Sequence, residues 1–104
     1  MSNTKPDLNE DTLSVIKEKI TVPPMYRVLL HNDDYTTRMF VVEILMAIFN
    51  KSMDEAAQIM WHVHKNGIGQ AGIYTYEVAE TKINQVTAVS REQGYPLKTT
   101  MEPE

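Results

Sequence analysis

The chain has no cysteine, and this absence excludes a disulfide framework, a thiolate zinc site and a cysteine nucleophile. It also lacks an apolar run long enough to span a bilayer. The first ten residues are polar and acidic, with no long apolar segment behind them, and so they do not resemble a signal peptide. A reducing compartment fits these absences, and we expect a cytoplasmic protein with no membrane partner.

Positive charge is scarce as well. Ten Lys and Arg residues against 14 Asp and Glu give a formal net charge of -4 and an isoelectric point near 5.3. No face rich in Lys and Arg is present to neutralise phosphates, which argues against nucleic acid as a partner. The 104 residues, 42% of them hydrophobic, are enough for one modest core. We therefore expect a monomeric single domain with one site, or with one site and a docking face.

Two segments of the chain differ in composition. Residues 1–22 mix polar and charged residues with isolated apolar ones, which predicts a flexible N-terminal arm. Pro23-Pro24 then stops any helix and begins extended backbone. We place the folded domain at residues 23–104.

The first half of this domain contains one predicted strand and two predicted helices. Tyr26–His31 is rich in β-forming residues and ends at a cluster of Asn and Asp, which is typical of a strand. A helix should begin near Thr37. Ser52 and Glu55 form a capping box that opens a second helix, which should end at Asn66-Gly67. Because the link between the helices is short, we expect them to pack as an antiparallel hairpin.

The second half should add two strands and a long helix. Ala71–Thr75 is a strand candidate, and Thr75 can cap a helix that runs from about Tyr76 to Gln93. Gly94 should end this helix, and Leu97–Met101 should form the last strand. The predicted fold class is α+β in the order β-α-α-β-α-β, with a small antiparallel three-stranded sheet packed against three helices.

The segment Asn32-Asp33-Asp34-Tyr35-Thr36 lies where the first strand must turn into the first helix. Asn and Asp ordinarily form such turns by bonding their own backbone, and this is the simplest interpretation. Asp33 and Asp34 could instead anchor a cation, act as an acid/base pair or bind a metal. The oxygen spacing of a calcium loop and the ligands of a zinc site are both absent. With Val41 one turn away, a cation anchor would suit a ligand with a cationic head and a hydrophobic body.

The pair His62 and His64 also suggests a metal, but residues two apart on a helix point about 200° apart and cannot share an ion. His64 borders the apolar side that carries Met60 and Val63, so we expect His62 to be the solvated one. Taken alone, His64 is explained by the helix dipole. The sequence shows neither an activated nucleophile nor a Gly-rich phosphate loop. A binding module without cofactor or metal is therefore favoured over an enzyme.

Three motifs together resemble the ClpS family, the adaptors of the bacterial Clp protease. They are the segments Pro23 to Thr36, Met60 to Gly67 and Glu77 to Lys82, in this order and with matching spacing, and the resemblance covers Pro23 to about Met101. It implies an adaptor that is not an enzyme. Such adaptors bind the free N-terminus of a protein that begins with Leu, Phe, Tyr or Trp, called an N-degron, and deliver it to the hexameric unfoldase ClpA, which feeds the ClpP peptidase.

The resemblance also implies roles for single residues. By the family pattern Asn32, Asp33 and His64 hydrogen-bond the α-ammonium and first peptide group of the substrate, and Asp34 matches too unless it serves the turn. The arm before Pro23 corresponds to an extension needed for delivery. The positions that match the pocket for the first side chain are Leu30, Thr36, Arg38, Val41, Met60, Val63 and Leu97. The positions that match the region docking on the N-terminal domain of the unfoldase are Glu77, Glu80 and Lys82.

One position departs from the family pattern. Many members have Pro-Met-Glu after the threonine, whereas this chain has Thr37-Arg38-Met39, so Arg38 replaces the usual gatekeeping methionine. Met39 lies about 100° around the helix and cannot substitute for it. We expect the selectivity of the pocket to change, either through the long stem of Arg38 or through its charge acting on the second residue of the substrate.

Two other functions remain open from the residues alone. A phosphoacceptor domain also carries paired acids at the end of a strand, but the chain lacks the repeated βα units of a doubly wound fold. A small acid/base enzyme would use Asp33 and His64.

Overall fold

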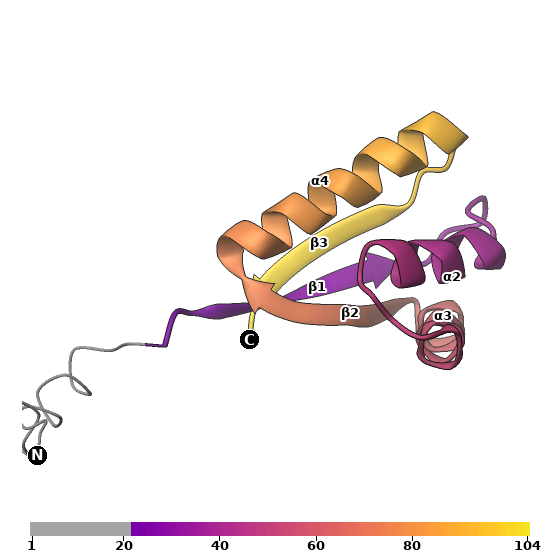
Figure 1. Ribbon diagram of the computed structural model, residues 1–104. Helices are drawn as coiled ribbons and strands as arrows, with labels where there is room; N and C mark the ends of the chain where they lie inside the picture. The colour runs from indigo at the N-terminus through magenta and orange to yellow at the C-terminus, as the bar shows by residue number, and fades with distance from the viewer. Residues whose placement is uncertain (1–21) are drawn as a thin grey trace, which may run out of the picture.

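The computed structural model describes residues 22–104, so nearly all of the predicted arm lies outside the described residues. The first half of the domain contains strand β1, Met25–His31, and helices α2, Arg38–Ala47, and α3, Met53–Asn66. The second half contains β2, Ile68–Thr75, α4, Tyr76–Gln93, and β3, Lys98–Pro103 (Figure 1). This order confirms the predicted α+β fold.

The sheet is antiparallel throughout and has β1 in its centre, with β2 on one side and β3 on the other. The register between β1 and β2 shifts between Val28 and Leu29, whereas β1 and β3 pair without a shift from Tyr26 to His31. Central placement satisfies both hydrogen-bonding edges of β1. The end of β1 is therefore a fixed point from which the next segment starts.

The helices pack against different parts of the sheet. α4 contacts all three strands and runs along β3, whereas α2 and α3 gather at the end where β1 finishes and β2 begins (Figure 1). The buried apolar side chains between sheet and helices form one core: Val28, Leu30, Phe40, Val41, Ile44, Leu45, Phe49, Ala56, Met60, Val63, Ala71, Ala79, Val86 and Leu97.

The predicted caps determine where α2 and α3 begin. The Thr37 hydroxyl accepts a hydrogen bond from the Phe40 backbone N–H at 3.1 Å. Ser52 and Glu55 form both bonds of the predicted capping box. α3 ends at Gly67 with φ 87°, a left-handed conformation that residues with a Cβ rarely adopt. These local signals give the helix boundaries correctly.

α4 runs from Tyr76 to Gln93 with Thr75 as its N-cap and Gly94 as its C-cap, as predicted, although the Thr75 side chain makes no cap hydrogen bond. Other local predictions were wrong. β3 begins at Lys98 and extends to Pro103, later at both ends than predicted. The predicted antiparallel hairpin is also wrong, because Figure 1 shows α2 from the side and α3 end-on, so the two helices cross steeply. The linker turns sharply at Asn50, which has a φ of 56°.

β2 begins at Ile68, earlier than the predicted Ala71. The prediction started too late because Gly69 is not a residue type that favours strands. Gly69 pairs with Leu30 and is buried against α3. A Cβ at this position would lie 2.6 Å from Cγ2 of Val63, so only glycine allows the strand to approach the helix this closely.

Lys82 ties α4 to the end of α2. Its Nζ donates a hydrogen bond to the backbone carbonyl of Ile48 at 2.6 Å and lies 5.8 Å from the Phe49 ring centroid and 5.2 Å from that of Tyr74. Ile48 is the C-cap of α2, so the ammonium satisfies a carbonyl that the helix leaves unpaired and complements the helix dipole. The ammonium of Lys82 is therefore engaged inside the fold.

We predict that Lys82→Met lowers the free energy of unfolding by about 1–2 kcal/mol, because it removes the hydrogen bond and both cation–π contacts but keeps an apolar stem. Chemical denaturation measures the change. Lys98→Met is the matched control, since Lys98 is exposed and its side chain makes no hydrogen bond or ion pair within residues 22–104. Equal midpoints for the Lys82 variant and the parent would contradict the prediction.

Candidate functional site

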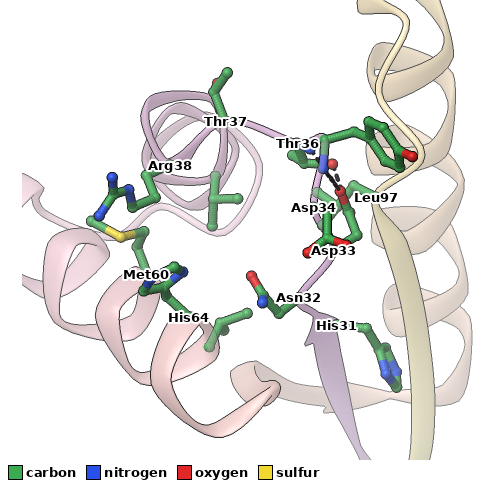
Figure 2. Close-up of a pocket in the computed structure, with 13 residues that line it drawn as sticks. His31, Asn32, Asp33, Asp34, Thr36, Thr37, Arg38, Met60, His64 and Leu97 are labelled. Atoms are coloured by element: carbon green, nitrogen blue, oxygen red, sulfur yellow. Dashed lines mark hydrogen bonds between the residues drawn. The ribbon is translucent and has the colours of Figure 1, made fainter.

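The carboxyl end of β1 opens into a cavity of about 430 Å³. The turn after β1, the start of α2, one side of α3 and the residue before β3 form its walls (Figure 2). Here the structure brings together most of the predicted site residues: Asn32, Asp33, Asp34, Thr36, Arg38, Val41, Met60, Val63, His64 and Leu97.

Asp33 holds the turn together. Its Oδ1 accepts hydrogen bonds from the backbone N–H groups of Tyr35 at 2.8 Å and Thr36 at 2.6 Å, and its Oδ2 accepts one from the Thr36 hydroxyl at 2.7 Å. Burial alone raises the pKa of Asp33, but the bonds from Thr36 and Tyr35 outweigh burial and hold the pKa below its ordinary value. Both carboxylate oxygens are thus committed to the turn.

Asp34 has a different environment from its neighbour. It is exposed, lines the cavity, and accepts no hydrogen bond from any residue in the range 22–104. The sequence pattern suggested Asp34 as the residue that serves the turn, but in the structure Asp33 does so. Asp34 keeps its full capacity to accept hydrogen bonds at the cavity.

Asn32 begins the acidic turn, residues 32–36, and connects this turn to α3. Its backbone N–H donates to the carbonyl of Gly67 at 2.9 Å, next to the end of the helix that carries His64. The Asn32 side chain stays at the cavity, where Figure 2 shows it between the acidic turn and His64. This hydrogen bond, together with the adjacent pairing of His31 with Ile68, fixes the spacing between the acidic turn and the histidine.

The inner wall of the cavity is apolar. Val41 comes from α2, Met60 and Val63 come from α3, and Leu97 comes from the segment before β3. All four are also part of the core and are at most 8% exposed. Their positions are fixed by core packing, so the cavity exists before any ligand enters.

The two histidines separate as the sequence predicts. His64 lines the cavity, and its ring lies edge-on to Trp61 with the centroids 5.8 Å apart. His62 lies outside the cavity wall, and its Nδ1 is 3.1 Å from Nδ2 of Asn66. Of the two, only His64 can reach a ligand in the cavity.

Leu30 is the predicted pocket residue that does not reach the cavity. It is fully buried on the core side of β1, because side chains alternate along a strand and the cavity begins at the next residue, His31.

His31 lines the cavity, although the sequence analysis assigned it no role. Burial, and then the charge of Lys98, lowers the pKa of His31, whose Nε2 lies 2.8 Å from Oγ1 of Thr100. The wall also includes Tyr35 and Thr37, which were not predicted.

The predicted docking residues lie away from the cavity, on α4. Glu77 and Glu80 are exposed, whereas Lys82 is half-buried and contacts the end of α2. Within residues 22–104 no helix is long and apolar enough to cross a membrane, and no three His, Asp or Glu side chains lie close enough to hold a metal ion together.

Comparison with known proteins adds independent evidence. A family model described as the ATP-dependent Clp protease adaptor protein ClpS matches residues 21–100. The chain belongs to the ClpS family. The ClpS adapter of Desulforapulum autotrophicum is 55% identical over 104 residues, which cover 100% of both chains. That of Myxococcus xanthus is 56% identical over 98 residues, which cover 94% of this chain and 92% of the relative.

A solved structure agrees with the fold of this ClpS-family chain. The structure of Agrobacterium tumefaciens ClpS2 bound to L-phenylalaninamide matches with a TM-score of 0.77 and 40% sequence identity, over 80% of this chain and 100% of that one. The chain is thus a Clp protease adaptor that acts in protein degradation. The comparisons give no support to a phosphoacceptor or an acid/base enzyme.

We predict that Asp33→Ala lowers the free energy of unfolding by about 1–2 kcal/mol at neutral pH, because three hydrogen bonds of the turn are lost. Its matched control, Asp34→Ala, should unfold like the parent. Because the pKa of Asp33 is lowered in the folded state, its contribution is complete above the ordinary carboxyl pKa of about 4 and disappears as the pH falls through the folded-state value.

Denaturant titrations of the three proteins from neutral to acidic pH measure these differences. The gap between the parent and Asp33→Ala should close at the acidic end. If Asp34→Ala loses as much stability as Asp33→Ala, the division of roles between the two carboxylates is wrong.

Proposed function

We propose that this ClpS-family adaptor binds the free N-terminus of proteins that begin with Leu, Phe, Tyr or Trp and delivers them to a ClpA-type unfoldase. The observation that carries the proposal is the placement of an acidic turn directly beside a preformed apolar cavity. An N-terminal hydrophobic residue has the same two parts, an α-ammonium next to an apolar side chain. L-phenylalaninamide, the ligand in the related ClpS2 structure, shares this chemistry.

The α-ammonium has three N–H donors and needs three acceptors. The Asn32 side-chain oxygen, the Asp34 carboxylate and an imidazole nitrogen of His64 are the acceptors that the cavity offers. Asp33 contributes indirectly, because its hydrogen bonds to Tyr35 and Thr36 fix the backbone from which Asn32 and Asp34 project. Charge-assisted bonds at a partly desolvated site contribute roughly 1.5–3 kcal/mol each.

The side chain of the first residue enters the apolar part of the cavity. Val41, Met60, Val63 and Leu97 surround it, and Thr36 lies at the boundary with the acidic turn. Burying a Leu or Phe side chain there contributes roughly 1.5–3 kcal/mol. The unbranched Met60 can adapt to guests of different shape, which fits acceptance of both aliphatic and aromatic residues. Polar contacts thus select the free terminus, and the apolar wall selects the residue.

Docking on the N-terminal domain of the unfoldase is proposed for α4. Glu77 and Glu80 are exposed on this helix, so they can contact a partner while the cavity is occupied. Lys82 acts through the position of α4, because its ammonium is bonded to the carbonyl of Ile48. The segment before Pro23 lies outside the described residues, and we propose from its composition and its place in the family pattern that it is required for delivery.

Binding should depend on a charged, free amine. We predict that acetylating the N-terminus of a Leu or Phe peptide weakens binding more than about 100-fold, because the charge and two of the donors are lost. Fluorescence anisotropy measures this affinity. Affinity should also fall as the pH rises past about 8, where the peptide amine deprotonates.

A matched pair of variants locates the amine contact. Asp34→Asn should weaken binding of the free peptide at least about tenfold without changing stability. Asp54→Asn, an exposed change in the first turn of α3, should leave affinity unchanged. Equal affinity for free and acetylated peptides would refute the proposed function.

Delivery should be separable from peptide binding. We predict that a double variant, Glu77→Lys with Glu80→Lys, and a protein that starts at Pro23 both bind N-degron peptides with parental affinity but fail to promote their degradation by ClpA and ClpP. The charge-reversed protein should also lose binding to the isolated N-terminal domain of the unfoldase, whereas the shortened protein should keep it.

Two measurements check this prediction: degradation of a fluorescent N-degron substrate and a pull-down with the N-terminal domain. Charge reversal at Glu43 serves as the control, because Glu43 is exposed on α2 beside Val89 and Gln93, at the opposite end of α4 from Glu77. Full degradation activity in either test protein would show that the altered segment has no part in delivery.

A further inference from the structure

Arg38 occupies a defined place at the rim of the cavity. It is the first residue of α2 and lines the cavity, and its Cζ lies 5.0 Å from the centroid of the Trp61 ring on α3. Trp61 in turn lies edge-on to His64. A guanidinium over an indole face is held by cation–π attraction, which restricts a side chain that is otherwise flexible. The positive charge is thus fixed beside the cavity, next to the histidine.

The stability of α2 does not explain this arginine. A positive charge in the first turn of a helix opposes the helix dipole, and the first turn of α2 contains no acidic residue that would offset it. Within residues 22–104 the guanidinium forms no ion pair, since the ion pair found there joins Arg27 to Glu102. Arg38 therefore keeps free hydrogen-bond donors at the rim of the cavity.

Charge is divided between opposite walls of the cavity. Figure 2 shows the two aspartates on one side, and Arg38 with Met60 on the other. If the α-ammonium of the substrate lies at the acidic turn, the first residue has no negative group that could pair with Arg38. The chain that follows the first residue must leave across the rim, with successive Cα atoms about 3.8 Å apart. Its first side chains are then within reach of a long arginine.

We propose that Arg38, held on Trp61, is a specificity-determining residue that favours a carboxylate side chain at the second or third position of the substrate and disfavours a cationic one. This inference rests on the proposed N-terminal binding and adds the class of substrate to it: hydrophobic first residue, acidic residue soon after. The preference is a difference between affinities, so it operates without weakening the best neutral ligand.

The test uses Phe-initiated peptides that carry Glu, Gln or Lys at the second position, and a second series that carries the same residues at the third position. Each Gln peptide is also prepared with an acetylated N-terminus. Anisotropy titrations should give about two- to fivefold tighter binding for Glu than for Gln, the range expected of a solvent-exposed ion pair, and weaker binding for Lys. Raising the ionic strength from about 0.05 M to about 0.5 M should reduce the Glu preference, because exposed charges are screened.

Variants separate the charge from its placement. Arg38→Met should abolish the preference while the Gln peptide still binds. Trp61→Leu should reduce it, because the guanidinium is no longer held at the rim, and circular dichroism checks that the helix is intact. Trp61 is 44% exposed, so this change does not open the core.

The outcomes distinguish this inference from the proposed function. If the Gln peptide binds and its acetylated form does not, but Glu and Lys peptides bind equally or Arg38→Met keeps the preference, the inference on Arg38 is overturned and N-terminal binding stands. If free and acetylated peptides bind equally, N-terminal binding itself fails. A Glu preference that disappears in Arg38→Met and decreases in Trp61→Leu supports the inference.

Discussion

The hydrogen bond from the backbone N–H of Asn32 to the carbonyl of Gly67 is the constraint on which the site depends. It joins the end of β1 to the end of α3, two segments that are distant in sequence. Together with the adjacent pairing of His31 with Ile68, it fixes the spacing between the acidic turn and His64. Because β1 is the central strand and Gly67 is held in a left-handed cap, both partners are rigid. A small domain can in this way preorganise a polar site with little material.

The acidic turn shows how two neighbouring carboxylates take different roles. Asp33 uses its oxygens to close the turn and is stabilised in its charged form by the donors it satisfies. Asp34, one residue later, lines the cavity and can accept hydrogen bonds there. Two adjacent free carboxylates would repel one another and raise the pKa of one of them. Asp33 stays ionised because the turn supplies its donors, and the acceptors of Asp34 remain available at the cavity.

The fold also separates the cavity from the face of α4. The cavity lies at the end of the sheet where β1 finishes, whereas the exposed acids of α4 lie along the helix (Figure 1). Lys82 connects these regions through the C-cap of α2, the helix whose first turn carries Arg38. An adaptor needs such a separation, because it must hold a substrate and contact a protease component at the same time.

Local signals in the sequence determined the order of the elements, the caps at Thr37 and Ser52, and the helix-ending glycines, because each depends on neighbours within a few residues. The family motifs identified most of the cavity wall because the resemblance to known adaptors already carries their tertiary arrangement. Only the tertiary structure decided that Leu30 faces the core, that α2 and α3 cross steeply, that Asp33 rather than Asp34 closes the turn, and that Arg38 rests on Trp61. The choice between the two adjacent aspartates depends on the backbone conformation of the turn, which the residue types alone leave open. The other three depend on which surfaces meet in the fold, and a pattern read along one segment carries no information about the other segment that it will contact.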